Sequence, residues 1–205
     1  MKEIYIIRHA ESISNAGQKA DNHDQIPLSE KGKGQAKELA EKLDIVPELI
    51  VVSSYSRTRE TAEPFIAKHP NVPIEIWDVH EFTYLAKHHY NGKTATERTD
   101  AAYDYWKNAH IHHKNEDSES FHELTERMRA FVAKLKERKE NIITIFSHGR
   151  FIYALQLYLE KLKQLGKTEL TDEEIMELKM ANAQTFNPDV KFPIDNVSVH
   201  KIELD

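Results

Sequence analysis

The 205-residue sequence contains no cysteine and no long hydrophobic run. The absence of cysteine excludes disulfide bonds, thiolate chemistry and zinc sites with cysteine ligands. No apolar segment approaches the roughly 20 residues that a membrane-spanning helix needs. A strand pattern begins at once, without the hydrophobic region of a signal peptide. We therefore expect no membrane partner and a cytoplasmic location.

The sequence also lacks an excess of positive charge. Its 28 Lys and Arg residues against 34 Asp and Glu residues give a net charge of −6. Nucleic-acid binding normally needs a basic face, so no nucleic-acid partner is expected, although a local cationic pocket is compatible with this charge. The length and the 40% apolar content fit one globular domain, 1–205, with an insertion at about 82–117. The sequence indicates no particular oligomeric state.

Two short apolar runs, rich in β-branched residues, each end next to a histidine. Residues 4–7 are followed by Arg8 and His9, and residues 142–146 are followed, one residue later, by His148. Such a run before a helical pattern is typical of a buried strand in a parallel sheet. Because ligands bind beyond the carboxyl ends of these strands, we expect the two histidines to share one crevice.

Strand and helix patterns alternate along the chain, which predicts an α/β fold. We expect a three-layer α/β/α sandwich with a mostly parallel central sheet flanked by helices, and an insertion over the C-terminal edge of the sheet. Further strands are predicted at 49–52 and 73–77, and a last strand, around Val197 and Val199, at a sheet edge. The predicted helices follow N-caps at Ser29, Ser120 and Thr171, or lie near 57–67, 100–108 and 151–165, the last ended by Gly166.

The polar residues after these strands indicate a phosphate site. A phosphoryl group carries close to two negative charges and needs cations in a fixed geometry. Arg8 and Arg57 each offer a planar fork of donors that matches phosphate oxygens. Asn15 could donate an amide hydrogen bond, and the backbone amides around Ala10 and Gly149 could do so where they open a helix.

The two histidines are expected to have different roles. His9 would attack phosphorus through a neutral ring nitrogen and become a phosphohistidine. Its neighbours Arg8 and Arg57 disfavour the protonated ring and so keep it nucleophilic. His148 would donate to the phosphate as an imidazolium that the phosphate itself stabilises.

The leaving alcohol needs a general acid, and Glu81 is the best candidate. It lies four residues after Trp77, and burial beside Trp77 and Phe82 would keep it protonated until it is needed. The same group would later activate water as a base. Glu11 and Glu97 are the alternative carboxylates, and a solvated loop position is the alternative interpretation of Glu81.

Several distinctive segments follow one another along nearly the whole chain: 8–12 with Asn15, 28–36, 53–62, 147–149 and 196–198. In this order they resemble the histidine phosphatase superfamily, also called phosphoglycerate-mutase-like, with 8–12 similar to its RHG motif. The resemblance implies a phosphatase for a small phosphorylated substrate, with His9, Glu81 and His148 as catalytic residues. It implies phosphate binding by Arg8, Arg57, Asn15 and Gly149, and neither metal nor cofactor.

Two residues depart from the pattern of that family. Ala10 stands where glycine is usual, which is tolerable if the backbone there has a negative φ angle. Arg150 adds a cation near the pocket and would favour a substrate with a second acidic group.

Other functions and structural roles remain open. A mutase needs a closed cationic lid, whereas 82–117 is aromatic and mixed in charge and lacks the paired tyrosine-arginine segment of family mutases. A non-catalytic relative would bind phosphorylated ligands, and a zinc hydrolase is disfavoured because no HExxH spacing occurs. The structural alternatives are Arg57 as an ion-pair partner of Glu60 or Glu63, His148 as a core histidine, and Lys87, Lys93, Arg98 and the histidines of 82–117 as solvated groups.

Overall fold

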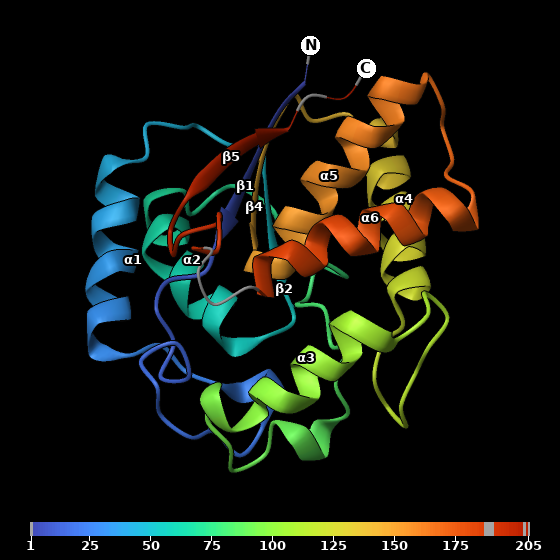
Figure 1. Ribbon diagram of the computed structural model, residues 1–205. Coiled ribbons are helices and arrows are strands. Elements are labelled where there is room, and N and C mark those ends of the chain that lie inside the picture. Colours follow the sequence, from blue (N-terminus) through green and yellow to red (C-terminus); the bar gives the residue numbers. More distant parts are fainter. Residues whose placement is uncertain (1, 187–190, 203, 205) are drawn as a thin grey trace.

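The computed structural model describes residues 2–186, 191–202 and 204. Its centre is a five-stranded sheet in the order β3-β2-β4-β1-β5 (Figure 1). The strands are β1 (Glu3–Arg8), β2 (Leu49–Ser53), β3 (Ile74–Trp77), β4 (Ile142–Ser147) and β5 (Val199–Ile202). β1 to β4 pair in parallel, and β5 pairs antiparallel with β1 at the edge, so the mostly parallel sheet and its edge strand are confirmed.

Helices cover both faces of the sheet, which confirms the three-layer sandwich. The helices are α1 (Glu30–Lys42), α2 (Ser56–Lys68), α3 (Thr99–Asn108), α4 (Phe121–Glu137), α5 (Gly149–Leu165) and α6 (Asp172–Ala183). Ile7 of β1 packs in a cluster with residues of α1 and α2, whereas its neighbour Ile6 packs in a cluster with residues of α4, α5 and α6. This alternation of side chains across the strand sorts the helices into two layers (Figure 1).

The helix starts follow from their capping residues. Ser29 accepts a hydrogen bond from the amide of Gly32, and Ser120 and Thr171 each form a reciprocal capping box with the glutamate three residues later. Gly166, at φ +63°, ends α5 in the left-handed conformation. These boundaries agree with the sequence prediction.

Two boundaries differ from the prediction by two residues, and the others by at most one. α5 begins at Gly149, two residues earlier than expected, with His148 as its N-cap. β5 begins at Val199, because Val197 adopts a left-handed φ of +54° and lies outside the strand. The amide of Val197 donates to the carbonyl oxygen of Arg8, so the chain turns at the end of β1 before pairing begins.

The segment 82–117 leads from β3 to α4 and lies beyond the carboxyl ends of the parallel strands (Figure 1). It contains α3, which buries Ala102, Tyr105 and Trp106 at helical spacing. Beside the one predicted helix, it holds 3-10 turns at Lys87–His89 and Thr96–Arg98. Further 3-10 turns lie at His23–Gln25 and Gln184–Phe186. In the described part of the chain, no helix is long and apolar enough to span a bilayer.

Candidate active site

The ends of neighbouring strands bring the predicted site residues together. β1 and β4 pair in parallel with Arg8 opposite Ser147, so the next residues, His9 and His148, leave the sheet side by side. Their ring centroids lie 5.2 Å apart. Arg57 joins them from the first turn of α2, which follows β2. The two histidines and Arg57 are therefore neighbours, as expected from the sequence, but His9 and Arg57 line the pocket and His148 lies outside its lining.

His9 is buried in a defined tautomer. Its Nδ1 lies 2.7 Å from the carbonyl oxygen of Ala10. A carbonyl oxygen only accepts, so Nδ1 carries the hydrogen and Nε2 keeps its lone pair. Nε2 accepts a hydrogen bond from Nε of Arg57 at 3.3 Å. Burial, followed by the charges of Arg57 and Arg8, holds the pKa of His9 well below its usual range, so the ring is neutral.

Arg57 is 3% exposed and held from two sides. It donates to the carbonyl oxygen of His23 at 2.9 Å, and its guanidinium lies over the ring of Tyr55. These contacts, rather than an ion pair with a glutamate, fix its position. The alternative of a surface ion pair with Glu60 or Glu63 is therefore wrong.

Arg8 is held at one end and keeps a donor unpaired. It donates through Nη1 to the carbonyl oxygen of Ile194, and its guanidinium lies 5.7 Å from the ring centre of Phe192. Its buried Nε has no hydrogen-bond partner among the described residues. A buried charged donor without a partner is costly, so this geometry suits an anion.

His148 is fully buried behind His9. Its Nε2 lies 2.9 Å from Oγ of Ser53, and its Nδ1 finds no partner in the described part of the structure. Burial, and then the charges of Arg57 and His9, hold the pKa of His148 well below its usual range. The imidazolium expected from the sequence therefore requires a neighbouring anion. Ser53, at the end of β2, is a partner that the sequence did not indicate.

Glu81 lies in the loop after β3 and is joined to the start of α5. Its Oε1 accepts hydrogen bonds from the backbone amides of Phe82, Arg150 and Phe151 at 3.0–3.2 Å. Two of these amides belong to the first turn of α5, where the helix dipole attracts negative charge. Oε2 accepts no hydrogen bond from the residues that the structure describes. Glu81 also lines the pocket that contains His9.

The two alternative carboxylates, Glu11 and Glu97, form hydrogen bonds and ion pairs outside the pocket. Glu11 accepts from Ser29 and pairs with Lys31 at the start of α1. Glu97 pairs with Lys19 at the surface, and hydrogen bonds, the largest from the amide of Thr94, lower the pKa of Glu97 to about 2. Of the described residues that line the pocket, Glu81 is the one carboxylate.

Asn15 lies in the wall of the pocket, whereas Gly149 lies against Arg8 and Phe192. Asn15 lines the pocket, and its Oδ1 accepts from the amide of Ser12, which leaves the amide nitrogen of the side chain as a donor. Neither Gly149 nor His148 is among the described residues that line the pocket, and the role of Gly149 in substrate binding stays a prediction. A Cβ atom at Gly149 would lie 2.8 Å from the ring of Phe192 and 3.1 Å from Nε of Arg8. Glycine here therefore allows the close packing of Arg8.

The backbone amides expected to bind phosphate are otherwise engaged. The amide of Ala10 donates to Oγ1 of Thr61 at 2.9 Å, and no helix begins at Ala10. The amides of Arg150 and Phe151 donate to Glu81. Ala10 has no positive φ angle, so alanine is tolerated in place of glycine as predicted.

The pocket has a volume of about 150 Å³, and part of its lining comes from 82–117. Tyr90 and Arg98 line it from this segment, with the Arg98 guanidinium 4.8 Å from the ring centre of Tyr90. Arg98 is half-exposed and lines the pocket, so the alternative of a solvated group stays open beside a role in substrate binding. Arg150 lines the pocket as predicted, with its guanidinium 3.8 Å from the ring centre of Phe186.

His23 also lines the pocket, and the sequence did not indicate it. Its ring lies 4.1 Å from that of Tyr90, and neither ring nitrogen has a partner among the described residues. Burial, and then the charge of Arg57, hold the pKa of His23 well below its usual range. It lies in a polar loop, where no periodic pattern distinguishes a buried histidine from an exposed one.

Comparisons with known proteins agree with this geometry. The sequence profile of the histidine phosphatase superfamily (branch 1) matches residues 4–187. An uncharacterised phosphatase of Bacillus subtilis, PhoE, is 30% identical over 186 residues, which are 89% of this chain and 86% of that protein. A probable phosphoglycerate mutase of Citrobacter koseri, GpmB, is 30% identical over 155 residues, which are 73% of this chain and 70% of that protein.

Solved structures share the fold. The α-ribazole phosphatase of Shigella flexneri superposes with a TM-score of 0.69 at 20% identity, covering 99% of this chain and 91% of that chain. The profile match over most of the sequence agrees with the resemblance that the motifs around His9 and His148 indicated. The chain therefore belongs to the histidine phosphatase superfamily.

Proposed function

We propose that this protein is a phosphatase that hydrolyses phosphomonoesters through a phosphohistidine on Nε2 of His9. The observation that carries the proposal is the state of His9, a buried neutral imidazole whose lone pair faces the guanidinium of Arg57. A neutral ring nitrogen is needed for attack on phosphorus. The adjacent cations keep the ring neutral and attract the phosphate dianion.

In the first step, Nε2 of His9 forms a bond to phosphorus while the bond from phosphorus to the leaving oxygen breaks. Glu81 gives its proton to that oxygen, and an alcohol leaves. Oε2 is the oxygen suited to carry this proton, since Oε1 accepts three backbone amides.

In the second step, the Glu81 carboxylate takes a proton from water, and the water oxygen attacks the phosphorus of the phosphohistidine. The nitrogen–phosphorus bond breaks, inorganic phosphate forms, and His9 regains its lone pair. Glu81 ends the cycle protonated, as it began. No step calls for a metal ion or a cofactor.

Charge on the transferring phosphoryl group is stabilised by fixed donors. Arg8 and Arg57 supply guanidinium groups, and Asn15 supplies its side-chain amide. His148 donates as an imidazolium once the phosphate is bound, from a ring in contact distance of His9. Such donors are effective because they are already oriented before the reaction.

We propose a small phosphomonoester with a second acidic group as the substrate class. The cavity of about 150 Å³ is small, and Arg98 and Arg150 add two cations to its lining beyond Arg8 and Arg57. A carboxylate or a second phosphate would pair with them.

A phosphoryl-transferring mutase is the second candidate, because one relative is named a probable phosphoglycerate mutase. A mutase must return the phosphoryl group to the same bound molecule and exclude water. Arg98 and Glu81 are both half-buried, so water can reach the pocket beside them. This access to water favours hydrolysis over transfer within a closed site.

The test is a panel of phosphorylated metabolites, with an aryl phosphate as reference and a chelator present. We expect release of inorganic phosphate, fastest from doubly acidic substrates, and no isomerisation of phosphoglycerate. Isomerisation without phosphate release would establish the mutase instead. Tight binding of phosphate with no turnover of any ester would identify a non-catalytic relative.

A further inference from the structure

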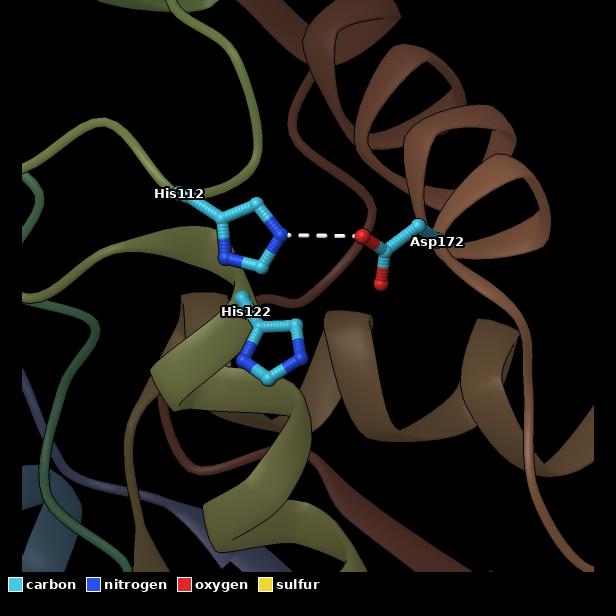
Figure 2. Close-up of side chains that lie close together, drawn as sticks. All are labelled: His112, His122 and Asp172. Carbon is cyan, nitrogen blue, oxygen red and sulfur yellow. Dashed lines mark hydrogen bonds and ion pairs between the residues drawn. The ribbon is translucent and has the colours of Figure 1, made fainter.

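Three metal-ligating side chains converge on the surface, outside the phosphate pocket. His112 lies in the loop after α3, His122 in the first turn of α4 and Asp172 in the first turn of α6. One ligand atom from each lies within 4.8 Å of the other two. Figure 2 shows both imidazole rings presenting a nitrogen on the side of the Asp172 carboxylate.

The distances suit a tetrahedral metal ion. Nε2 of His112 lies 3.0 Å from Oδ2 of Asp172, and the rings of His112 and His122 are 4.5 Å apart (Figure 2). In a tetrahedral zinc site with bonds of about 2.0–2.1 Å, neighbouring ligand atoms are about 3.3 Å apart. Small rotations of these side chains, of which His112 and Asp172 are exposed and His122 is half-buried, would convert the cluster into a coordination shell.

The donor set indicates which cation fits. Two imidazole nitrogens and one carboxylate oxygen suit Zn²⁺ and related divalent transition metals, whereas Mg²⁺ and Ca²⁺ prefer oxygen ligands alone. The ring of His110 stacks 5.5 Å from that of His112 and lies outside the three-residue group, so water would complete the coordination. The hollow beside the cluster, of about 460 Å³, is lined by His110 and His112 and gives an ion access from solvent.

We propose that His112, His122 and Asp172 form a binding site for a divalent transition-metal ion, with Zn²⁺ the best match. The ion would join the end of segment 82–117 to α4 and α6. That segment carries Tyr90 and Arg98 into the phosphate pocket, so the ion would stabilise the wall of the pocket without touching the reacting groups. None of the three ligands lines the pocket.

The sequence spacing could not reveal this cluster. Its ligands come from three different segments, and Asp172 meets the two histidines because α6 packs against α4. The search for an HExxH spacing detects ligands on one helix and misses such an arrangement.

The test is calorimetric titration of Zn²⁺ into tag-free protein that has been stripped with a chelator. We expect one saturable site per chain and a rise in melting temperature when it is filled. His112→Ala, His122→Ala and Asp172→Asn should each weaken the affinity at least about tenfold. His113→Ala removes an exposed histidine next to the cluster and should leave the affinity unchanged.

A second readout uses Co²⁺, whose visible absorption is intense only in a four-coordinate site. The unmodified protein and His113→Ala should show it, and His112→Ala should not. The absence of saturable Zn²⁺ binding would overturn the proposal. So would affinities that are equal in the three ligand variants and in the unmodified protein, because other histidines would then hold the metal. Both readouts are independent of phosphatase activity.

Discussion

The floor and the roof of the phosphate pocket are built in different ways. The floor is formed by Arg8 at the end of β1, His9 directly after it and Arg57 in the first turn of α2. Hydrogen bonds hold Arg57 against His9 and against the carbonyl oxygen of His23. The roof is formed by Tyr90 and Arg98, which come from a segment of 3-10 turns and one short helix. Strand pairing places the floor residues within narrow limits, whereas the roof depends on loop packing.

The floor and the roof therefore have different tasks in the proposed reaction. The floor holds the groups that every phosphomonoester would need, a nucleophile and fixed cations. The roof contacts the rest of the substrate, where phosphorylated molecules differ from one another. Changes in the floor should therefore reduce kcat, and changes in the roof should mainly raise KM.

Glu81→Gln is expected to give the largest loss among variants that keep the nucleophile. The amide of glutamine keeps an oxygen for the three backbone donors but cannot transfer a proton. We expect kcat to fall by about 10²–10⁴-fold with alkyl phosphates. The loss should be much smaller with aryl phosphates whose leaving groups need no proton. An equal loss with both ester types would remove Glu81 from the role of acid.

Arg57→Lys is expected to reduce kcat by about 10²–10³-fold, the effect of losing one oriented donor. Lysine keeps the charge but loses the planar fork that contacts both Nε2 of His9 and the carbonyl oxygen of His23. Arg59→Lys is the matched control, since Arg59 is exposed on the same helix. Similar kinetics for the two variants would contradict the assignment of Arg57 to the floor.

Arg98→Ala tests the roof and should be milder. A charge-assisted hydrogen bond at a half-exposed position contributes about 1.5 kcal/mol, so KM should rise about tenfold for a doubly acidic substrate. A phenyl phosphate with no second acidic group should be affected less. Lys93→Ala, in the same segment but outside the pocket, should leave KM unchanged. If kcat fell while KM stayed constant, Arg98 would belong with the floor.

Three histidines in and next to the pocket, His9, His23 and His148, make stability depend on pH. The pKa values of His9, His23 and His148 are all lowered by burial, so these rings stay neutral in the folded chain when unfolded histidines, with pKa near 6.5, begin to bind protons. The unfolded chain then binds more protons, and the free energy of unfolding falls as pH decreases below about 6.5. For each histidine that is protonated in the unfolded chain and neutral in the folded chain, the free energy of unfolding falls by about 1.4 kcal/mol per pH unit.

Urea unfolding at pH 7.5, 6.5 and 5.5 checks this effect. His23→Phe keeps a ring between its aromatic neighbours and removes one titrating group. The change in the free energy of unfolding per pH unit should therefore decrease by about 1.4 kcal/mol, the contribution of one histidine. An unchanged slope in this variant would show that His23 titrates in the folded protein as it does in the unfolded chain.

The same contrast explains how far the sequence predicted the structure. The order of strands and helices, the caps at Ser29 and Ser120, and the floor of the pocket follow from local periodicity and from the rule that strand ends meet. The sequence predicts α5 two residues late, because His148 follows a strand directly and occupies the N-cap position without a side-chain capping bond. No local pattern marks a dual role of this kind.

The roof and the histidine cluster were beyond prediction for another reason. Arg98 enters the pocket because Tyr90 packs beneath its guanidinium, and Tyr90 is held in turn by the ring of His23. These contacts join residues that no periodic pattern relates. The position of Glu81 after β3 is visible in the sequence, but two of its three amide donors depend on where α5 begins.

The central claim is that Nε2 of His9 becomes phosphorylated. Rapid quenching with alkali of the protein mixed with a phosphate-labelled substrate, followed by peptide mapping, tests it directly. The account predicts an acid-labile, alkali-stable phosphoryl group on His9 that accumulates in Glu81→Gln and is absent from His9→Ala, which still binds inorganic phosphate. Turnover by His9→Ala at a rate near that of the unmodified protein, or a label on another residue, would contradict it.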